Sequence, residues 1–99
     1  MQGKITVQAR FRARAGMEEA LKELLLALIE PSRSDEGCLN YDLHQAIDDP
    51  AVFVFYENWQ SREHLDRHSA TPHLNLFRSK AKALLAEAPE LTLLNMISG

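Results

Sequence analysis

Residues 51–59, with the sequence AVFVFYENW, constrain the fold more than any other segment of this 99-residue chain. They form its most apolar and aromatic stretch, which is typical of a β-strand. Successive strand side chains point to opposite faces of a sheet, and here apolar residues occupy both sets of alternate positions. One set is Val52, Val54 and Tyr56; the other is Phe53, Phe55 and Trp59. Both faces of this strand therefore require cover, and we expect helices over the face of the second set.

Three further segments have strand patterns. Residues 4–13 alternate between apolar and polar side chains, which is typical of a half-buried strand. Residues 38–47 form a second strand, and Asp48-Asp49-Pro50 is a turn sequence that should join it to residues 51–59 as a hairpin. Residues 91–97 are apolar at both sets of positions and predict the last strand.

Helical periodicity occurs in two places. From Met17 the apolar residues recur at three- and four-residue intervals, which predicts a helix that begins after Gly16 as N-cap and ends before Pro31. Ser61 is a suitable N-cap for a short helix over residues 62–69. Thr71-Pro72 then predicts the start of another helix, which we expect to continue to Pro89.

The predicted order is β-α-β-β-α-β, an α+β arrangement of the ferredoxin-like type with a four-stranded antiparallel sheet, and residues 1–99 are expected to form one domain. The helices would cover one face of the sheet. The other face would expose apolar side chains, which usually indicates an interface. We therefore predict a homodimer joined through its sheet faces, a dimeric α/β-barrel.

Composition excludes several partner classes. The net charge is −3, so no basic surface for nucleic acid is expected. No apolar run approaches the ~20 residues that span a membrane, and the N-terminal residues lack the apolar core of a secretion signal. Cys38 is the only cysteine and suits a small core position better than a nucleophile. We expect a cytoplasmic protein.

Several short motifs together resemble the antibiotic biosynthesis monooxygenase (ABM) family, in particular its small members of the quinol monooxygenase type. The motifs span nearly the whole chain: residues 11–18 (FRARAGME), residues 31–41 (PSRSDEGCLNY), Asp49-Pro50, Glu57-Asn58-Trp59, His64-Leu65, His68 and Thr71-Pro72-His73. Their order and spacing carry the resemblance, because each piece alone is weak. The resemblance implies a dimer, a pocket between sheet and helices, and oxidation of a small aromatic quinol-like compound by molecular oxygen without a cofactor.

The histidines are the candidate catalytic residues. His73 follows Pro72 in the first turn of a predicted helix, where the positive end of the helix dipole favours a neutral imidazole that can accept a phenol proton. His68 is expected to act beside it. The alternative for His73 is a structural role, as a cap or as a partner of a backbone carbonyl. A metal site formed by His64, His68 and His73 is also conceivable, but no carboxylate or Cys is spaced to complete it, and we expect no metal.

Aromatic residues are the candidate substrate contacts. Trp59 ends the strand predicted over residues 51–59 and is suited to stack on a flat substrate, although core packing is its alternative role. Only one of Glu57 and Asn58 can face the pocket, and Glu57 has cross-strand pairing as an alternative role. The other predicted lining residues are Tyr41, His44, Phe53, Phe55 and Phe77.

Other functions remain open at this point. The haem-degrading relatives require an Asn, a Trp and a His where this chain offers Gln8, His68 and Arg78, so the resemblance does not extend to haem. A non-redox enzyme of the isomerase type, acting on a small metabolite, would use the same pocket. A non-catalytic dimer that binds aromatic ligands would use it as well.

Overall fold

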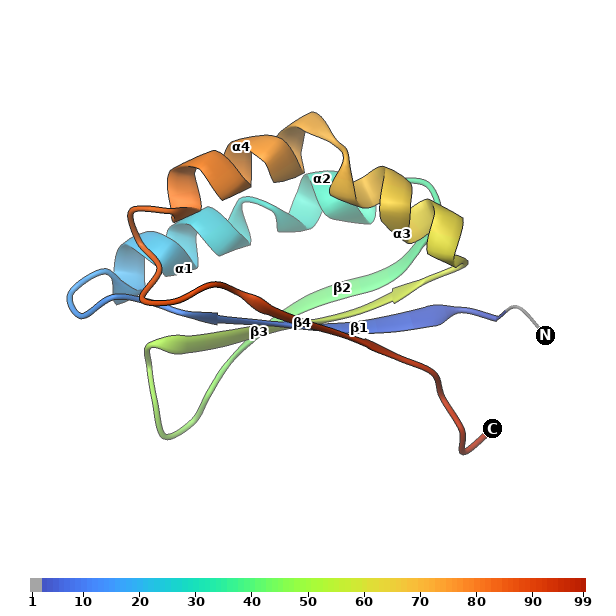
Figure 1. Ribbon diagram of the computed structural model, residues 1–99, viewed down its shortest axis with the longest axis horizontal. Helices are drawn as coiled ribbons and strands as arrows, with labels where there is room; N and C mark the ends of the chain where they lie inside the picture. The colour runs from blue at the N-terminus through green and yellow to red at the C-terminus, as the bar shows by residue number, and fades with distance from the viewer. Residues whose placement is uncertain (1–2) are drawn as a thin grey trace.

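Four strands form one antiparallel sheet in the order β2-β3-β1-β4, and four helices lie on one of its faces (Figure 1). The computed structural model describes residues 3–99. Its elements, in chain order, are β1 (Ile5–Arg12), α1 (Glu18–Leu26), α2 (Ile29–Arg33), β2 (Cys38–Gln45), β3 (Val52–Trp59), α3 (Arg62–Ser69), α4 (Pro72–Ala81) and β4 (Glu90–Leu94). The predicted ferredoxin-like α+β fold is confirmed.

The central strand β3 directs its second set of alternate residues toward the helices, as predicted. Phe55 lies opposite Ala9 of β1 and Leu43 of β2, and it is buried beneath the helices. Phe11, on the same face of the sheet, packs edge-to-face against Phe55 and against Phe77 of α4. Edge-to-face pairs of this kind add to the stability that burial provides. The core between the two layers is therefore built mainly on β1 and β3.

The opposite face of the sheet has no helix over it in the part of the chain that is described (Figure 1). Tyr56 is 41% exposed there, next to Gln8 of β1, and Leu94 of β4 is equally exposed. The face is more polar than the sequence pattern predicts, because β4 spans Glu90–Leu94 instead of residues 91–97 and places Glu90, Thr92 and Leu94 on this side. The uncovered face is compatible with the predicted dimer, which stays a prediction.

The helical segments are shorter than predicted. The first helix ends at Leu26, and a turn at Ala27 and Leu28 separates it from α2, which contains Pro31. Proline is tolerated there because it occupies the first turn of the new helix, where its missing N–H costs no hydrogen bond. The last helix ends at Ala81 rather than near Pro89, because Leu85 instead forms a bridge with Ala13 at the end of β1.

Both predicted side-chain caps are present. The Ser61 hydroxyl accepts a hydrogen bond from the His64 N–H at 3.2 Å, and the Thr71 hydroxyl accepts one from the Leu74 N–H at 3.4 Å. At the first helix, Met17 takes the N-cap position instead of Gly16, which has a positive φ of 87° and forms the preceding turn. Within residues 3–99, no helix is long and apolar enough to cross a membrane.

Replacing Ser61 with alanine is expected to destabilise the protein by about 1 kcal/mol, because one N–H at the start of α3 then loses its acceptor. The Ser61 hydroxyl also bonds His64 Nδ1 at 2.8 Å, so both contacts are removed together. Urea unfolding measures the change. Ser79→Ala, at an exposed position of α4, is the matched control and should leave the midpoint unchanged. Equal stability of Ser61→Ala and wild type would contradict this prediction.

Candidate functional site

A cavity of about 340 Å³ lies between the sheet and the helices, as the resemblance implied. Its floor is formed by residues of β1, β2 and β3, including Phe55, and its roof by residues of α3 and α4, including Phe77. Four residues of its lining are exposed, Arg78, Lys82, Pro89 and Leu91, and we refer to them as its mouth. A volume of this size falls in the range of small-molecule sites, and the walls are mainly apolar.

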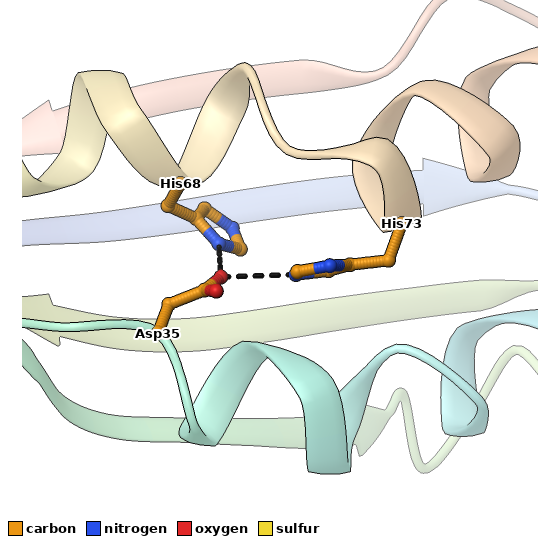
Figure 2. Close-up of side chains that lie close together, drawn as sticks. All are labelled: Asp35, His68 and His73. Carbon is orange, nitrogen blue, oxygen red and sulfur yellow. Dashed lines mark hydrogen bonds and ion pairs between the residues drawn. The ribbon is translucent and has the colours of Figure 1, made fainter.

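One histidine of α3 enters this cavity. His68 lines the wall and is only 4% exposed. Its Nδ1 lies 2.8 Å from Oδ2 of Asp35, which belongs to the loop between α2 and β2. Nε2 of His73, at the start of α4, lies 2.9 Å from the same carboxylate oxygen. Figure 2 shows both rings directed at Asp35 from consecutive helices.

This geometry assigns protons to the two rings. A carboxylate oxygen only accepts hydrogen bonds, so each ring donates an N–H to Asp35. His68 Nε2 is then left with a free lone pair. Burial lowers the pKa of His68, and the hydrogen bond that His68 donates to Asp35 opposes this only in part. His68 is therefore a neutral imidazole held in one tautomer, which is the form that a general base needs.

A stack of rings fixes the position of His68 from the side of the sheet. The Trp59 ring lies 4.4 Å from the His68 ring between centroids, with an angle of 32° between the planes. Tyr41 of β2 contacts His68 edge-on at 5.4 Å. Together with the bond to Asp35, these contacts leave the imidazole little freedom to rotate.

The second ionisable group of the cavity is Glu57 of β3. It lines the wall, is 4% exposed, and accepts a hydrogen bond from Trp59 Nε1 at 2.9 Å. Burial raises the pKa of Glu57 to about 7, although the bond from Trp59 works in the other direction. Glu57 therefore changes its charge close to neutral pH.

The structure brings some of the predicted substrate contacts together and separates others. Four predicted site residues line the cavity: His68, Tyr41, Phe55 and Phe77. Trp59 and Phe53 lie on the same face of β3 but are fully packed behind the wall, so the core role considered for Trp59 is the one observed.

Two predicted histidines lie elsewhere. The placement of His44 in the pocket is wrong: it alternates with Tyr41 and Leu43 along β2, so it is exposed on the opposite face of the sheet, opposite Val54. His73 lies outside the main cavity and borders a smaller groove between α1 and α4. Its link to the cavity is indirect, through Asp35 and His68.

Two site residues were missed, Asp35 and Glu57. Glu57 has the same alternation as Phe55, so the predicted orientation of β3 was sufficient to place it on the helix side. For Asp35 no comparable pattern exists, because it lies 33 and 38 residues from its two partners. Its polar loop gives no indication of which side chain turns inward.

Asp35, His68 and His73 also form a donor set that could hold a divalent metal ion, since one ligand atom from each lies within 4.8 Å of the others. The spacing along the sequence indicated no carboxylate that could complete a set with His64, His68 and His73, whereas the fold brings Asp35 to His68 and His73, and His64 is not part of the set. The two distances of 2.8 and 2.9 Å are equally those of ordinary hydrogen bonds. That the protein functions without a bound metal ion stays a prediction.

Comparisons with known proteins agree with this architecture. Residues 4–80 match the family described as Antibiotic biosynthesis monooxygenase. Among curated proteins, the chain is 36% identical over 94 residues to one named Putative monooxygenase Rv0793 from Mycobacterium tuberculosis, covering 95% of this chain and 92% of that protein. It is 29% identical over 82 residues to Putative monooxygenase YcnE from Bacillus subtilis, covering 83% of this chain and 86% of the relative.

Solved structures of similar chains have the same fold. The crystal structure of PA3566 from Pseudomonas aeruginosa superimposes with a TM-score of 0.92 at 37% identity, over 98% of this chain and 97% of that one. The structure of Rv0793 gives a TM-score of 0.90 at 35% identity, over 95% of each chain. The family match covers most of the residues that form the sheet, the helices and the cavity, and the chain therefore belongs to the antibiotic biosynthesis monooxygenase family.

Proposed function

We propose that the chain is a cofactor-independent monooxygenase that oxidises a small aromatic quinol-like compound with molecular oxygen. One observation carries the proposal: a neutral histidine, His68, is held by Asp35 at the wall of an apolar cavity of suitable size. Relatives named as monooxygenases support the reaction class.

In the proposed mechanism, His68 Nε2 removes the proton of a phenolic hydroxyl. The resulting anion is electron-rich, and one of its ring carbons that carries hydrogen adds to oxygen to form a hydroperoxide. Loss of water from this hydroperoxide leaves a carbonyl group, so one oxygen atom enters the product and the other leaves as water. The substrate supplies the electrons, and the protein supplies proton abstraction, orientation and exclusion of bulk water.

Asp35 and His73 act on His68 rather than on the substrate. The carboxylate fixes the tautomer of His68 and stabilises the imidazolium that forms when the base takes up a proton, as a buried carboxylate does in other histidine-based sites. His73 donates to the same oxygen and so holds Asp35 in place. We therefore assign the chemical role to His68 and a positioning role to His73.

Oxygen uptake in the presence of menadiol tests the proposed function. We expect uptake above the rate of spontaneous oxidation, with one labelled atom in the hydroxylated quinone when isotopically labelled oxygen is supplied. The protein is purified without a histidine tag, and its metal content is measured, so that activity is attributed to the chain alone. Uptake equal to that with heat-denatured protein would contradict the proposal for menadiol. Rearrangement of a ligand without oxygen uptake would favour an isomerase, and binding without turnover a ligand-binding module.

We further propose that the chain assembles as a homodimer through the uncovered sheet face. Tyr56 lies in that face and is partly exposed together with Leu94. Sedimentation at micromolar concentration is expected to give twice the mass of the chain. Tyr56→Glu should shift the mass toward that of a monomer, because burying a charge without a partner in the interface costs free energy. His44→Ala, on the same face at an exposed edge position, is the control, and a monomeric wild type would contradict the proposal.

A further inference from the structure

Glu57 is a buried carboxyl group that packing does not explain. It lies in β3 between Phe55 and Trp59, opposite Val7 of β1 and Tyr41 of β2. Among residues 3–99 no arginine, lysine or histidine forms an ion pair with it. Burying a carboxyl group without a cationic partner costs free energy, and an apolar side chain of similar size would avoid that cost. A function at the cavity wall accounts for the presence of this residue.

The hydrogen bonding of Glu57 leaves one of its oxygens for a ligand. Oε1 accepts the bond from Trp59 Nε1, and this is the one hydrogen bond of the Glu57 side chain within residues 3–99. Oε2 has no protein partner there, yet it is not sealed within the core, since Glu57 forms part of the cavity wall. Trp59 thus orients the carboxyl group from behind, and its second oxygen is the one left for a ligand.

The position of Glu57 complements that of His68. Glu57 belongs to the sheet and His68 to the helical layer, so the cavity has one proton-handling group in each of its two layers. Trp59 links them behind the wall, because it bonds Glu57 through Nε1 and stacks on His68. A flat ligand between the layers meets a polar group on each side.

We propose that Glu57 contacts the substrate directly and selects aromatic compounds that carry a second oxygen substituent, besides the hydroxyl group that His68 deprotonates. This inference rests on the proposed function, because it takes His68 as the group that receives the first hydroxyl. A second hydroxyl group can donate a hydrogen bond to Oε2, and a carbonyl oxygen can accept one when the carboxyl group is protonated. The selected compounds are dihydroxyarenes and hydroxyketones rather than simple phenols.

The groups around Glu57 set the electrostatic conditions for this contact. From β2 they are Tyr41 and Cys38, whose pKa values are both raised by burial first and by Glu57 next. Both side chains therefore stay protonated and uncharged at neutral pH. From α3 the neighbour is His68, from α4 it is the exposed Arg78 at the mouth, and Lys82 lies there directly after α4. Val7 of β1 is apolar, and Glu57 is the one acidic group among the described lining residues.

Calorimetric titration without oxygen tests the selection independently of turnover. The probes are 1-naphthol, with one hydroxyl group, and 1,4-naphthalenediol, with two. We expect the wild type to bind the diol about tenfold more tightly, which corresponds to one added hydrogen bond to a buried carboxyl group. Glu57→Leu should bind both ligands equally, with the affinity for 1-naphthol unchanged.

The pH dependence of the preference for the diol distinguishes direct contact between Glu57 and the ligand from a structural role of Glu57. For the wild type, the preference for the diol should be larger at about pH 8 than at about pH 6, because an ionised carboxylate accepts a stronger hydrogen bond. Glu57→Gln keeps the hydrogen-bonding shape, so its preference should persist but should not change with pH. This variant tests the inference even if Glu57→Leu fails to fold.

Two results would overturn the inference: equal preference for the diol in all three proteins, or no binding of either probe to the wild type. A Glu57-dependent preference without oxygen uptake would support this inference while contradicting the proposed monooxygenase. Oxygen uptake without such a preference would support the proposed monooxygenase and contradict this inference about Glu57.

Discussion

Replacing His68 with alanine is expected to lower enzyme-dependent oxygen uptake at least about a hundredfold, because a positioned general base contributes that factor or more. The rate of proton removal falls, whereas binding of the aromatic ring system depends mainly on apolar walls and should change much less. The loss should therefore appear in kcat more than in KM. Steady-state rates of oxygen uptake with menadiol, corrected for spontaneous oxidation, measure both.

The neighbouring residues provide graded controls for this experiment. Asp35→Asn should reduce kcat while leaving the cavity intact, because an amide can hold the wrong tautomer of His68. His73→Ala should have a smaller effect, since His73 touches Asp35 and not the cavity. His44→Ala, on the outer face, should retain wild-type kcat. Full activity of His68→Ala, or a greater loss of activity in His73→Ala than in His68→Ala, would contradict the assignment of His68 as the general base.

Glu57→Gln is expected to remove a pH dependence of stability worth about 3 kcal/mol, which follows from the displacement of the Glu57 pKa from 4.5 to about 7 at 1.36 kcal/mol per pH unit. The folded state keeps the proton of this carboxyl group in a pH range where the unfolded chain has lost it. Its contribution to stability is therefore fully present below pH 4.5, declines between pH 4.5 and about 7, and is absent above that range. Glutamine does not ionise, so the variant does not lose stability at this position as the pH rises.

Urea unfolding of both proteins across this pH range measures the effect. The free energy of unfolding of Glu57→Gln, relative to wild type, should rise with pH up to about 7 and then remain constant. His68 acts in the opposite sense in both proteins, because its lowered pKa removes stability as the pH falls, so the difference between the proteins isolates Glu57. A difference that does not vary with pH would contradict the burial of an ionisable Glu57.

The order of elements and the orientation of the central strand were predictable because they depend on local periodicity. Phe53, Phe55 and Trp59 share one set of alternate positions, and the helices cover that set. The placement of His44 in the pocket was wrong because it considered only the residue type. Alternation along β2 puts His44 on the face opposite to that of the buried Tyr41. The same alternation places Glu57 on the helix side of β3, whereas the prediction left the choice between Glu57 and Asn58 open.

The rest of the site depends on contacts that no local pattern encodes. Asp35 lies in the loop that follows α2, and α2 is separated from α1 by the turn at Ala27 and Leu28; from this loop Asp35 contacts His68. The sequence predicts one continuous helix up to Pro31, and this error hides the path of the chain. The relative placement of α3 and α4 likewise decides that His68, and not His73, enters the cavity.

The strict alternation along β3 has a consequence for how such a protein can change. Phe55 and Glu57 face the cavity, whereas Val54 and Tyr56 face away from it. Substitutions at one set can therefore alter the cavity wall while those at the other alter the uncovered face proposed for the dimer, and neither change needs to disturb the other. An insertion or deletion of a single residue in this strand would exchange the two sets and lose both properties at once. We expect variation in β3 to proceed by replacement and to leave its length constant.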